Sequence, residues 1–176
     1  MNYKLPTTNY QLQTTNSNRS YTIVELLIFM GLLSVLLVVV SEVFSTILDV
    51  RKESESTSSV VQDGNYLLQR LSYDIARASA INTPVNDGDS GISMGLTIEG
   101  AAFNYDLSGG NLVLTTGGNL YPLNGVNTTI TYLNFQRIGN LNDPKDTIKL
   151  NFIISSVTQR SGGPEVRNFE TTVGLR

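Results

Sequence analysis

Residues 23–41 read IVELLIFMGLLSVLLVVVS, and Glu25 is the only ionisable residue among these 19. A helix rises about 1.5 Å per residue, so a helix of this length spans roughly the 30 Å hydrocarbon core of a bilayer. A charged side chain is costly in lipid, and where one occurs it normally has a function. The run therefore predicts one membrane-spanning helix with Glu25 as its functional residue.

The segment before this run, residues 1–20, is polar and contains Lys4 and Arg19 but no acidic residue. In a secretory signal peptide the apolar region precedes the cleavage site and is removed. Here the apolar run follows the one plausible processing point, between Ser20 and Tyr21. We therefore expect the apolar run to remain in the mature chain.

The junction YTIVELL, residues 21–27, directly follows a basic and a small residue and resembles the leader junction of type IV pilins and type II secretion pseudopilins. The resemblance implies cleavage by a prepilin peptidase between Ser20 and Tyr21, and N-methylation of Tyr21. It also implies that Thr22 and Glu25 serve assembly, with Glu25 paired to the freed amine of a neighbouring subunit. Such a pair suits lipid, because a buried carboxylate is expensive without a positive partner.

Three positions depart from the usual family pattern. Ser20 stands where the family usually has glycine, and Tyr21 stands where it usually has phenylalanine. Glu42 stands where many major pilins have a helix-weakening proline, which favours a more continuous helix and a minor subunit over the bulk one. An uncleaved chain would keep its leader as a cytoplasmic tail.

The basic residues alone do not decide which end of the span faces the cytoplasm. Lys4 and Arg19 precede the run, and Arg51 and Lys52 follow it, so the positive-inside rule favours neither orientation clearly. The resemblance and the acid-free leader place the amino terminus in the cytoplasm and the chain after about Val50 outside. We expect a single-pass protein of the cytoplasmic (inner) membrane that lies in membrane lipid before assembly.

Composition excludes several classes of function. The chain has no His and no Cys, which removes Ser–His and Cys–His nucleophile systems, disulfides and most transition-metal sites. No glycine-rich phosphate loop is present either. We expect no enzyme and no cofactor. Without the leader, ten basic residues face fifteen acidic ones, and this net charge of −5 disfavours nonspecific nucleic-acid binding without excluding a local basic patch.

Beyond the apolar run, apolar and small residues recur at three- and four-residue spacing, which predicts an amphipathic continuation of the helix. They are Val60, Gly64, Leu67, Leu68, Leu71, Ile75 and Ala78. The Ser/Thr-rich run 53–59 and the turn-like triplet 63–65 predict a kink or none. Thr83–Pro84 should end the helix.

From Leu96 onward, short apolar segments alternate with Gly and Asn, and the tetrapeptides SGGN at 108–111 and TGGN at 116–119 are typical of hairpin turns. We expect half-buried antiparallel strands over residues 101–107, 112–115, 128–137, 148–154 and 169–175. They would form one sheet of five or six strands that covers the helix over residues 67–78. The fold class is α+β: a long N-terminal helix, with a membrane-spanning first half and an amphipathic second half, packed on a C-terminal antiparallel β-sheet.

The order of the later segments resembles that of J-type and W-type minor subunits. The matches are the helix end at 67–78, Asn119-Leu120-Tyr121, Leu133-Asn134-Phe135 and the closing segment 169–176. The implied regions are a prepilin leader over 1–20, a transmembrane and assembly helix over 21–48, its amphipathic continuation over 49–80, and a globular β-sheet domain over 81–176.

The resemblance implies a minor pilin or pseudopilin whose function is interaction, acting at filament initiation or at the tip. Its expected partners are the prepilin peptidase, other pilin or pseudopilin subunits and the inner-membrane assembly platform. The alternative is a single-span membrane-anchored extracytoplasmic binding domain, in which Tyr105, Tyr121 and Tyr132 could line a ligand site. A tether tolerates Glu25→Ala, whereas an assembling pilin should not.

Two acidic loops could supply oxygen ligands to calcium. They are residues 85–95, with Asp87 and Asp89, and residues 142–146, with Asp143 and Asp146. A full calcium loop needs six to eight oxygens and usually a distal bidentate carboxylate. The same residues are favoured in turns for backbone reasons. We therefore expect no metal in either loop.

Overall fold

The structure, a computed structural model, describes residues 21–140, 143–160 and 162–176. The predicted leader and Ser20 lie outside the described residues. The chain divides into two units, unit 1 up to Phe44 and unit 2 from Ser45 to Arg176. Helix α1 (Ile23–Ala76) has 54 residues and contributes to both units. The helix runs without a break through residues 53–59 and 63–65, so neither segment interrupts it.

In unit 2, α1 buries one stripe of side chains. The buried positions are Ser56, Val60, Gly64, Leu67, Leu71, Asp74 and Ile75. This pattern confirms the predicted amphipathic half, because the apolar members recur every three or four residues and so lie on one face. Asp74 is the charged member of the stripe.

The helix ends at Ala76, before the predicted stop at Thr83–Pro84. The amide of Ala78 bonds to the carbonyl of Ile75 and tightens the last turn. The amide and hydroxyl of Ser79 then both donate to the carbonyl of Thr97 in a neighbouring strand. The amides of Arg77 and Ala78 thus bond back to the last turn of the helix, Ser79 is the first residue to bond to a sheet, and the chain continues as a strand.

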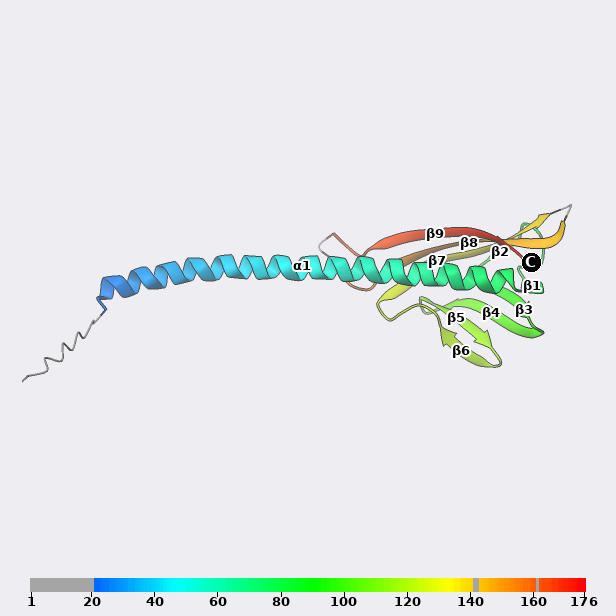
Figure 1. Cartoon of the computed structure of the whole chain (residues 1–176), viewed down its shortest axis with the longest axis horizontal. Coiled ribbons are helices and arrows are strands. Elements are labelled where there is room, and N and C mark those ends of the chain that lie inside the picture. Colours follow the sequence, from blue (N-terminus) through cyan, green and yellow to red (C-terminus); the bar gives the residue numbers. More distant parts are fainter. Residues whose placement is uncertain (1–20, 141–142, 161) are drawn as a thin grey trace, which may run out of the picture. The chain divides into compact units, whose positions relative to one another are not determined.

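Unit 2 contains two antiparallel sheets in its described part (Figure 1). Sheet A has the order β1-β3-β4-β5-β6, and sheet B has the order β2-β7-β8-β9. The strands are β1 (Ala80–Thr83), β2 (Ser90–Gly91), β3 (Met94–Ile98), β4 (Ala101–Ser108), β5 (Asn111–Thr116), β6 (Asn119–Pro122), β7 (Thr128–Asn140), β8 (Asp143–Ser156) and β9 (Val166–Gly174). The α+β class is confirmed, but the single sheet of five or six strands is wrong.

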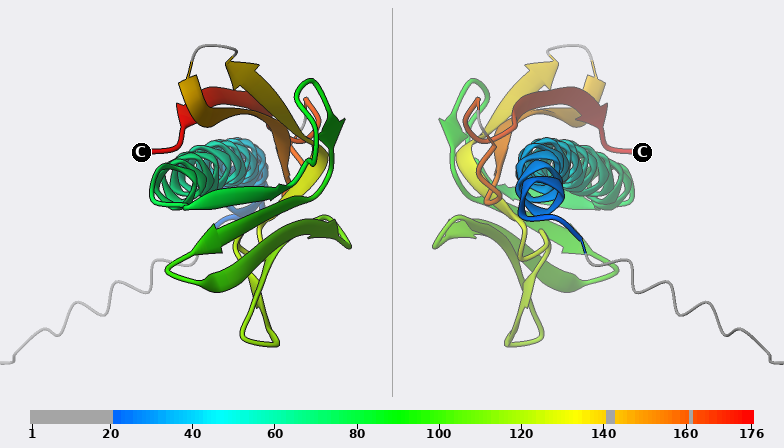
Figure 2. Two further views of the ribbon diagram at one scale, coloured as in Figure 1. Left: turned by 90° about the vertical axis from the view of Figure 1, so that its right-hand side faces the viewer. Right: turned by 90° about the vertical axis from the view of Figure 1, so that its left-hand side faces the viewer.

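The second half of α1 lies between the two sheets (Figure 2). Its apolar stripe joins a single core with residues of both, such as Leu96 and Leu114 of sheet A and Phe135 and Leu150 of sheet B. The one buried face of the helix is therefore covered by two sheets and not by the single predicted sheet. The sequence missed the division because β1, β2, β3 and β6 have two to five residues each, too few for a clear alternation.

Both predicted hairpin turns are present. Gly109 and Gly110 join β4 to β5, and Gly117 and Gly118 join β5 to β6. All four have positive φ, the conformation that two-residue hairpin loops require at their central positions. These two turns build the outer half of sheet A.

Gly64 permits a close contact between α1 and sheet B. A Cβ atom at this position would overlap the ring of Phe169 in β9. That ring is itself stacked on Phe152 of β8, with the ring centroids 5.3 Å apart. Glycine lowers the stability of a helix when only helix propensity is considered. At position 64, however, its lack of a Cβ atom allows β9 to approach the helix.

Gly64→Ala should destabilise unit 2 by about 1–3 kcal/mol, because the added methyl group must displace the Phe169 ring. Helix propensity alone predicts the opposite sign, a gain of about 1 kcal/mol. Urea denaturation of the full chain in detergent measures the difference. Gly31→Ala is the matched control, since nothing surrounds its Cβ position. A Gly64→Ala variant more stable than the wild type would contradict the packing role of Gly64.

Candidate functional site

The first turn of α1 is capped by Thr22. The amide of Leu26 donates to the Thr22 carbonyl, and the amide of Glu25 donates to Thr22 Oγ1 at 3.3 Å. Thr22 is therefore the N-cap residue, and Glu25 occupies the third helical position, as in a capping box. The positive end of the helix dipole favours a carboxylate there. The two predicted assembly residues thus lie together at the helix start.

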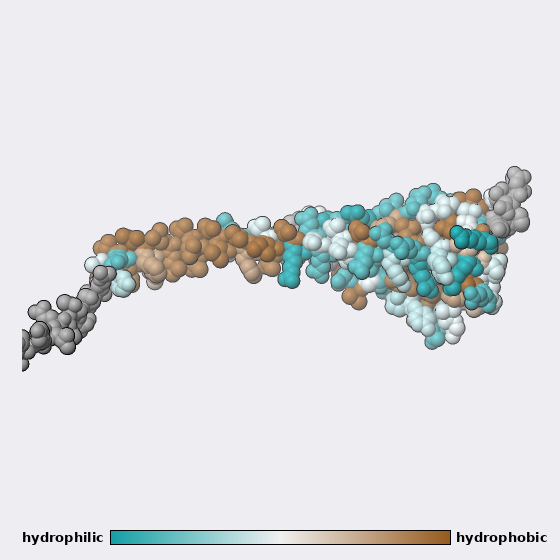
Figure 3. Space-filling view, in the orientation of Figure 1, coloured by the Kyte–Doolittle hydropathy of each residue, from teal (hydrophilic) through white to brown (hydrophobic). Residues whose placement is uncertain are grey.

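The surface of the first half of α1 is apolar. Every residue from Tyr21 to Val50 is exposed in the structure, and the visible face of this segment is almost uniformly hydrophobic in Figure 3. Among the described residues, α1 is the one helix long and apolar enough to cross a membrane. A helix that is apolar on all sides needs an apolar surrounding, either lipid or other helices. The segment is consistent with a single membrane span.

Tyr21 and Glu25 face a common depression on the helix surface, which Leu26 and Phe29 complete. Tyr21 is 78% exposed, so its main chain and ring are accessible. The depression combines one carboxylate with apolar walls, a surface that suits a cation carried on an apolar neighbour. Cleavage after Ser20, methylation of Tyr21 and the roles of Thr22 and Glu25 in assembly stay predictions.

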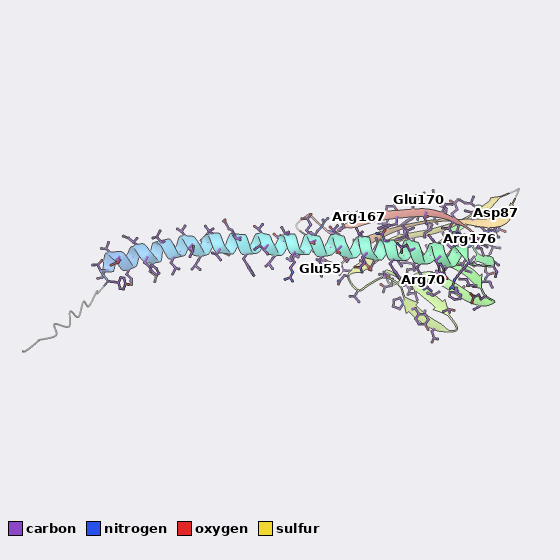
Figure 4. The ribbon with its side chains drawn as sticks, viewed as in Figure 1. Glu55, Arg70, Asp87, Arg167, Glu170 and Arg176 are labelled. Carbon is purple, nitrogen blue, oxygen red and sulfur yellow. The ribbon has the colours of Figure 1, made fainter. Side chains whose placement is uncertain are left out.

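A buried charge cluster lies near the end of α1. The Asp74 side chain is fully buried, and its Oδ2 accepts from Arg70 Nε at 2.7 Å and from the Tyr105 hydroxyl at 2.5 Å. Its Oδ1 accepts from Arg77 Nε at 3.2 Å. Figure 4 places Arg70 on the side of α1 that faces sheet A, to which Tyr105 belongs through β4. The cluster therefore joins the helix to that sheet.

The surroundings of this cluster raise the pKa values of two of its members, Tyr105 and Arg70. Burial, and after it the hydrogen bond to Asp74, raise the pKa of the Tyr105 hydroxyl well above its ordinary value. Partial burial by itself lowers the pKa of Arg70, but the charge of Asp74 and its hydrogen bond outweigh burial and raise it. Tyr105 therefore stays protonated and Arg70 stays charged at every pH at which the fold is stable.

Tyr105→Phe should make the free energy of unfolding fall less steeply as pH rises above about 10. In the wild type only the unfolded chain releases the Tyr105 proton, so this contribution to stability is present below about pH 10 and is lost as pH rises further. Between pH 10 and 11 the wild type should lose about 1 kcal/mol more free energy of unfolding than the variant. Urea denaturation at both pH values tests this, with Tyr132→Phe at an exposed tyrosine as control. Equal losses would contradict the assignment.

The two acidic loops considered for calcium meet around a guanidinium group. Arg137 of β7 bonds to Asp146 through Nη2 and lies 3.5 Å from an oxygen of Asp87 through Nε. Its Nη1 also donates to three carbonyl oxygens, those of Ile81, Pro84 and Val85. Asp87 and Asp146 are therefore already next to an internal cation. Among the described residues, no three of His, Cys, Asp and Glu gather as metal ligands.

The three tyrosines considered for a ligand site do not gather. Tyr105 is fully buried, whereas Tyr121 in β6 and Tyr132 in β7 are about half exposed and belong to different sheets. Tyr105 and Tyr121 lie in one cross-strand row of sheet A, with Leu114 between them. A shared ligand site built from all three is therefore wrong.

The sequence interpretation did not single out the role of Asp74. Its signal was present, because Asp74 falls in the apolar stripe between Leu71 and Ala78 with an arginine four residues before it and another three residues after it. On a helix this spacing brings both guanidinium groups to the same carboxylate. An acid on the buried face between two such arginines predicts a buried ion cluster.

Comparison of the chain with models of protein families, with curated proteins and with solved structures gave no match. The architecture, one long apolar N-terminal helix with antiparallel sheets against its second half, is pilin-like.

Proposed function

We propose that the chain is a minor pilin or pseudopilin, a structural subunit that enters a type IV pilus or a type II secretion-like filament through its N-terminal helix. The observation that carries the proposal is the first half of α1, which is exposed and apolar on all sides and carries Glu25 in its capped first turn. The leader junction at residues 21–27 and the β domain against the same helix support it.

In the proposed mechanism, the subunit first lies in the cytoplasmic membrane with unit 2 outside. A prepilin peptidase cuts between Ser20 and Tyr21, and the new amine is methylated. An assembly platform then moves the helix from lipid into a bundle of pilin helices. Lipid and the helix bundle are both apolar, so the hydrophobic effect does not drive transfer of the helix from one to the other. Specific packing and polar contacts between helices must drive it.

Glu25 supplies such a polar contact. The helix N-terminus carries about half a positive charge, which compensates the carboxylate only in part. The freed amine of Tyr21 in a neighbouring subunit supplies a full positive charge, and the depression beside Glu25 is open to it. The pair would fix the axial register between neighbouring helices, because both groups lie within the first turn of their chains.

Intact-mass measurement on the full chain from its own cell membranes tests the processing step. We expect a chain that begins at Tyr21 and carries one extra methyl group. A chain that begins at Met1 would contradict cleavage and favour a tethered extracytoplasmic binding domain. Ser20→Gly, which restores the usual family residue, should not change the cleavage position.

Glu25→Gln should leave cleavage and methylation of the chain unchanged but lower its yield in sheared filaments by at least about tenfold. Loss of one partner from a buried ion pair costs about 3–5 kcal/mol, and each 1.4 kcal/mol is worth tenfold in an equilibrium. Glu42→Gln is the matched control, because it removes another carboxylate from the exposed face of the same helix. Equal filament yields for the wild type and Glu25→Gln would contradict the assembly role of Glu25, and absence of both chains from filaments would favour the tethered binding domain.

A further inference from the structure

Two arginines share one buried carboxylate at the end of α1. Asp74 has no exposed surface, and the guanidinium groups of Arg70 and Arg77 approach it from opposite directions along the helix. One arginine would suffice to neutralise the carboxylate. In the described part of the chain, neither arginine forms a salt bridge with another acid. The cluster therefore carries a surplus of one positive charge at the surface.

Both guanidinium groups keep donors that no other group takes up. Arg70 uses Nε on Asp74, and Arg77 uses Nε and Nη2. Arg70 also interacts with the Tyr105 hydroxyl, and the remaining terminal nitrogens form no hydrogen bond to any other acceptor among the described residues. The two side chains are 36% and 33% exposed, so these nitrogens can reach an acceptor outside the chain. A guanidinium group binds a carboxylate most strongly through two parallel N–H donors.

Aromatic rings hold Arg77 in place. Its Cζ lies 4.9 Å from the ring centroid of Tyr73 and 5.8 Å from that of Phe103. Tyr73 is 61% exposed, and Phe103 packs against the core. Stacking and the salt bridge fix the orientation of Arg77 before any partner arrives, which reduces the entropy lost on binding. Tyrosine and arginine are also the side chains most enriched at energetically important interface positions.

We propose that Arg70, Tyr73, Arg77 and Phe103 form a docking surface for a carboxylate-bearing segment of a partner protein. The partner carboxylate takes the free guanidinium donors, and its neighbouring apolar or aromatic side chain covers the Tyr73 ring. Asp74 acts from beneath as the positioning residue for both arginines. The surface lies in unit 2, apart from Glu25, and its role does not depend on the assembly mechanism proposed above.

The charge balance favours a protein partner over a nucleic acid. A single-stranded nucleic acid also stacks on aromatic rings, but its affinity comes largely from neutralising several phosphates. The docking surface has one surplus positive charge, and the chain without its leader has a net charge of −5. One carboxylate matches that surplus, whereas a polyanion would be repelled by the rest of the chain.

Site-specific photo-crosslinking tests the docking surface. The full chain carries p-benzoylphenylalanine at Gln69, an exposed position on the same helix, and is irradiated in its own cell membranes. We expect one dominant protein adduct whose crosslinked peptide contains an Asp or a Glu. Tyr73→Ala and Arg77→Gln should each lower the adduct yield by at least about tenfold. Replacing the partner's acid by its amide should do the same.

The controls separate docking from folding. The Tyr73 side chain forms no hydrogen bond to Asp74, so Tyr73→Ala should leave the urea midpoint unchanged, whereas Arg77→Gln removes one partner of Asp74 but leaves Arg70 and Tyr105 on it and should keep the chain folded with a lowered midpoint. Tyr132→Ala, at a comparably exposed tyrosine of sheet B, should leave the adduct yield unchanged. An adduct with nucleic acid or lipid, a crosslinked peptide without an acid, no adduct, or a yield that both variants leave unchanged would each overturn the proposal.

Discussion

The burial of one face of α1 between two sheets is the constraint on which unit 2 depends. The stripe that contains Val60, Leu67 and Leu71 supplies the centre of a core to which both sheets contribute. Without the helix, each sheet would expose an apolar face to water. The close approach of β9 at Gly64 and the hydrogen bonds that Asp63 accepts from Gly125 and from Thr128 at the start of β7 accompany the same packing.

A single helix thus meets two different surroundings. In its first half the helix is largely apolar and none of it is buried within the chain, which is consistent with a single membrane span. In its second half one face is buried and the other is polar, so stability comes from the chain's own sheets. The change occurs near Arg51 and Lys52, the first basic residues of α1. This division gives the helix its proposed dual use, assembly through one half and support of a domain through the other.

The charged groups of unit 2 are organised by internal pairing. Arg137 satisfies two acidic loops and three carbonyl oxygens, and Asp74 satisfies two arginines and a tyrosine. Buried charges are tolerated only when they are paired and hydrogen-bonded. Asp74 meets that requirement, whereas Arg137 is paired and hydrogen-bonded through its terminal nitrogens but its buried Nε has no hydrogen-bond partner. They differ in their balance: two acids surround Arg137, whereas two bases surround Asp74 and leave a positive charge at the surface.

The sequence by itself determined the apolar helix, the amphipathic stripe and the hairpin turns at Gly109 and Gly117, whereas the cap at Thr22 was not predicted. The predicted features follow from local periodicity and local backbone preference, which neighbouring residues specify. Only the tertiary structure decided the division into two sheets, the helix end at Ala76, and the joining of Asp74 to Tyr105. The physical reason is that each of these depends on partners distant along the chain, whose positions are set when the core packs.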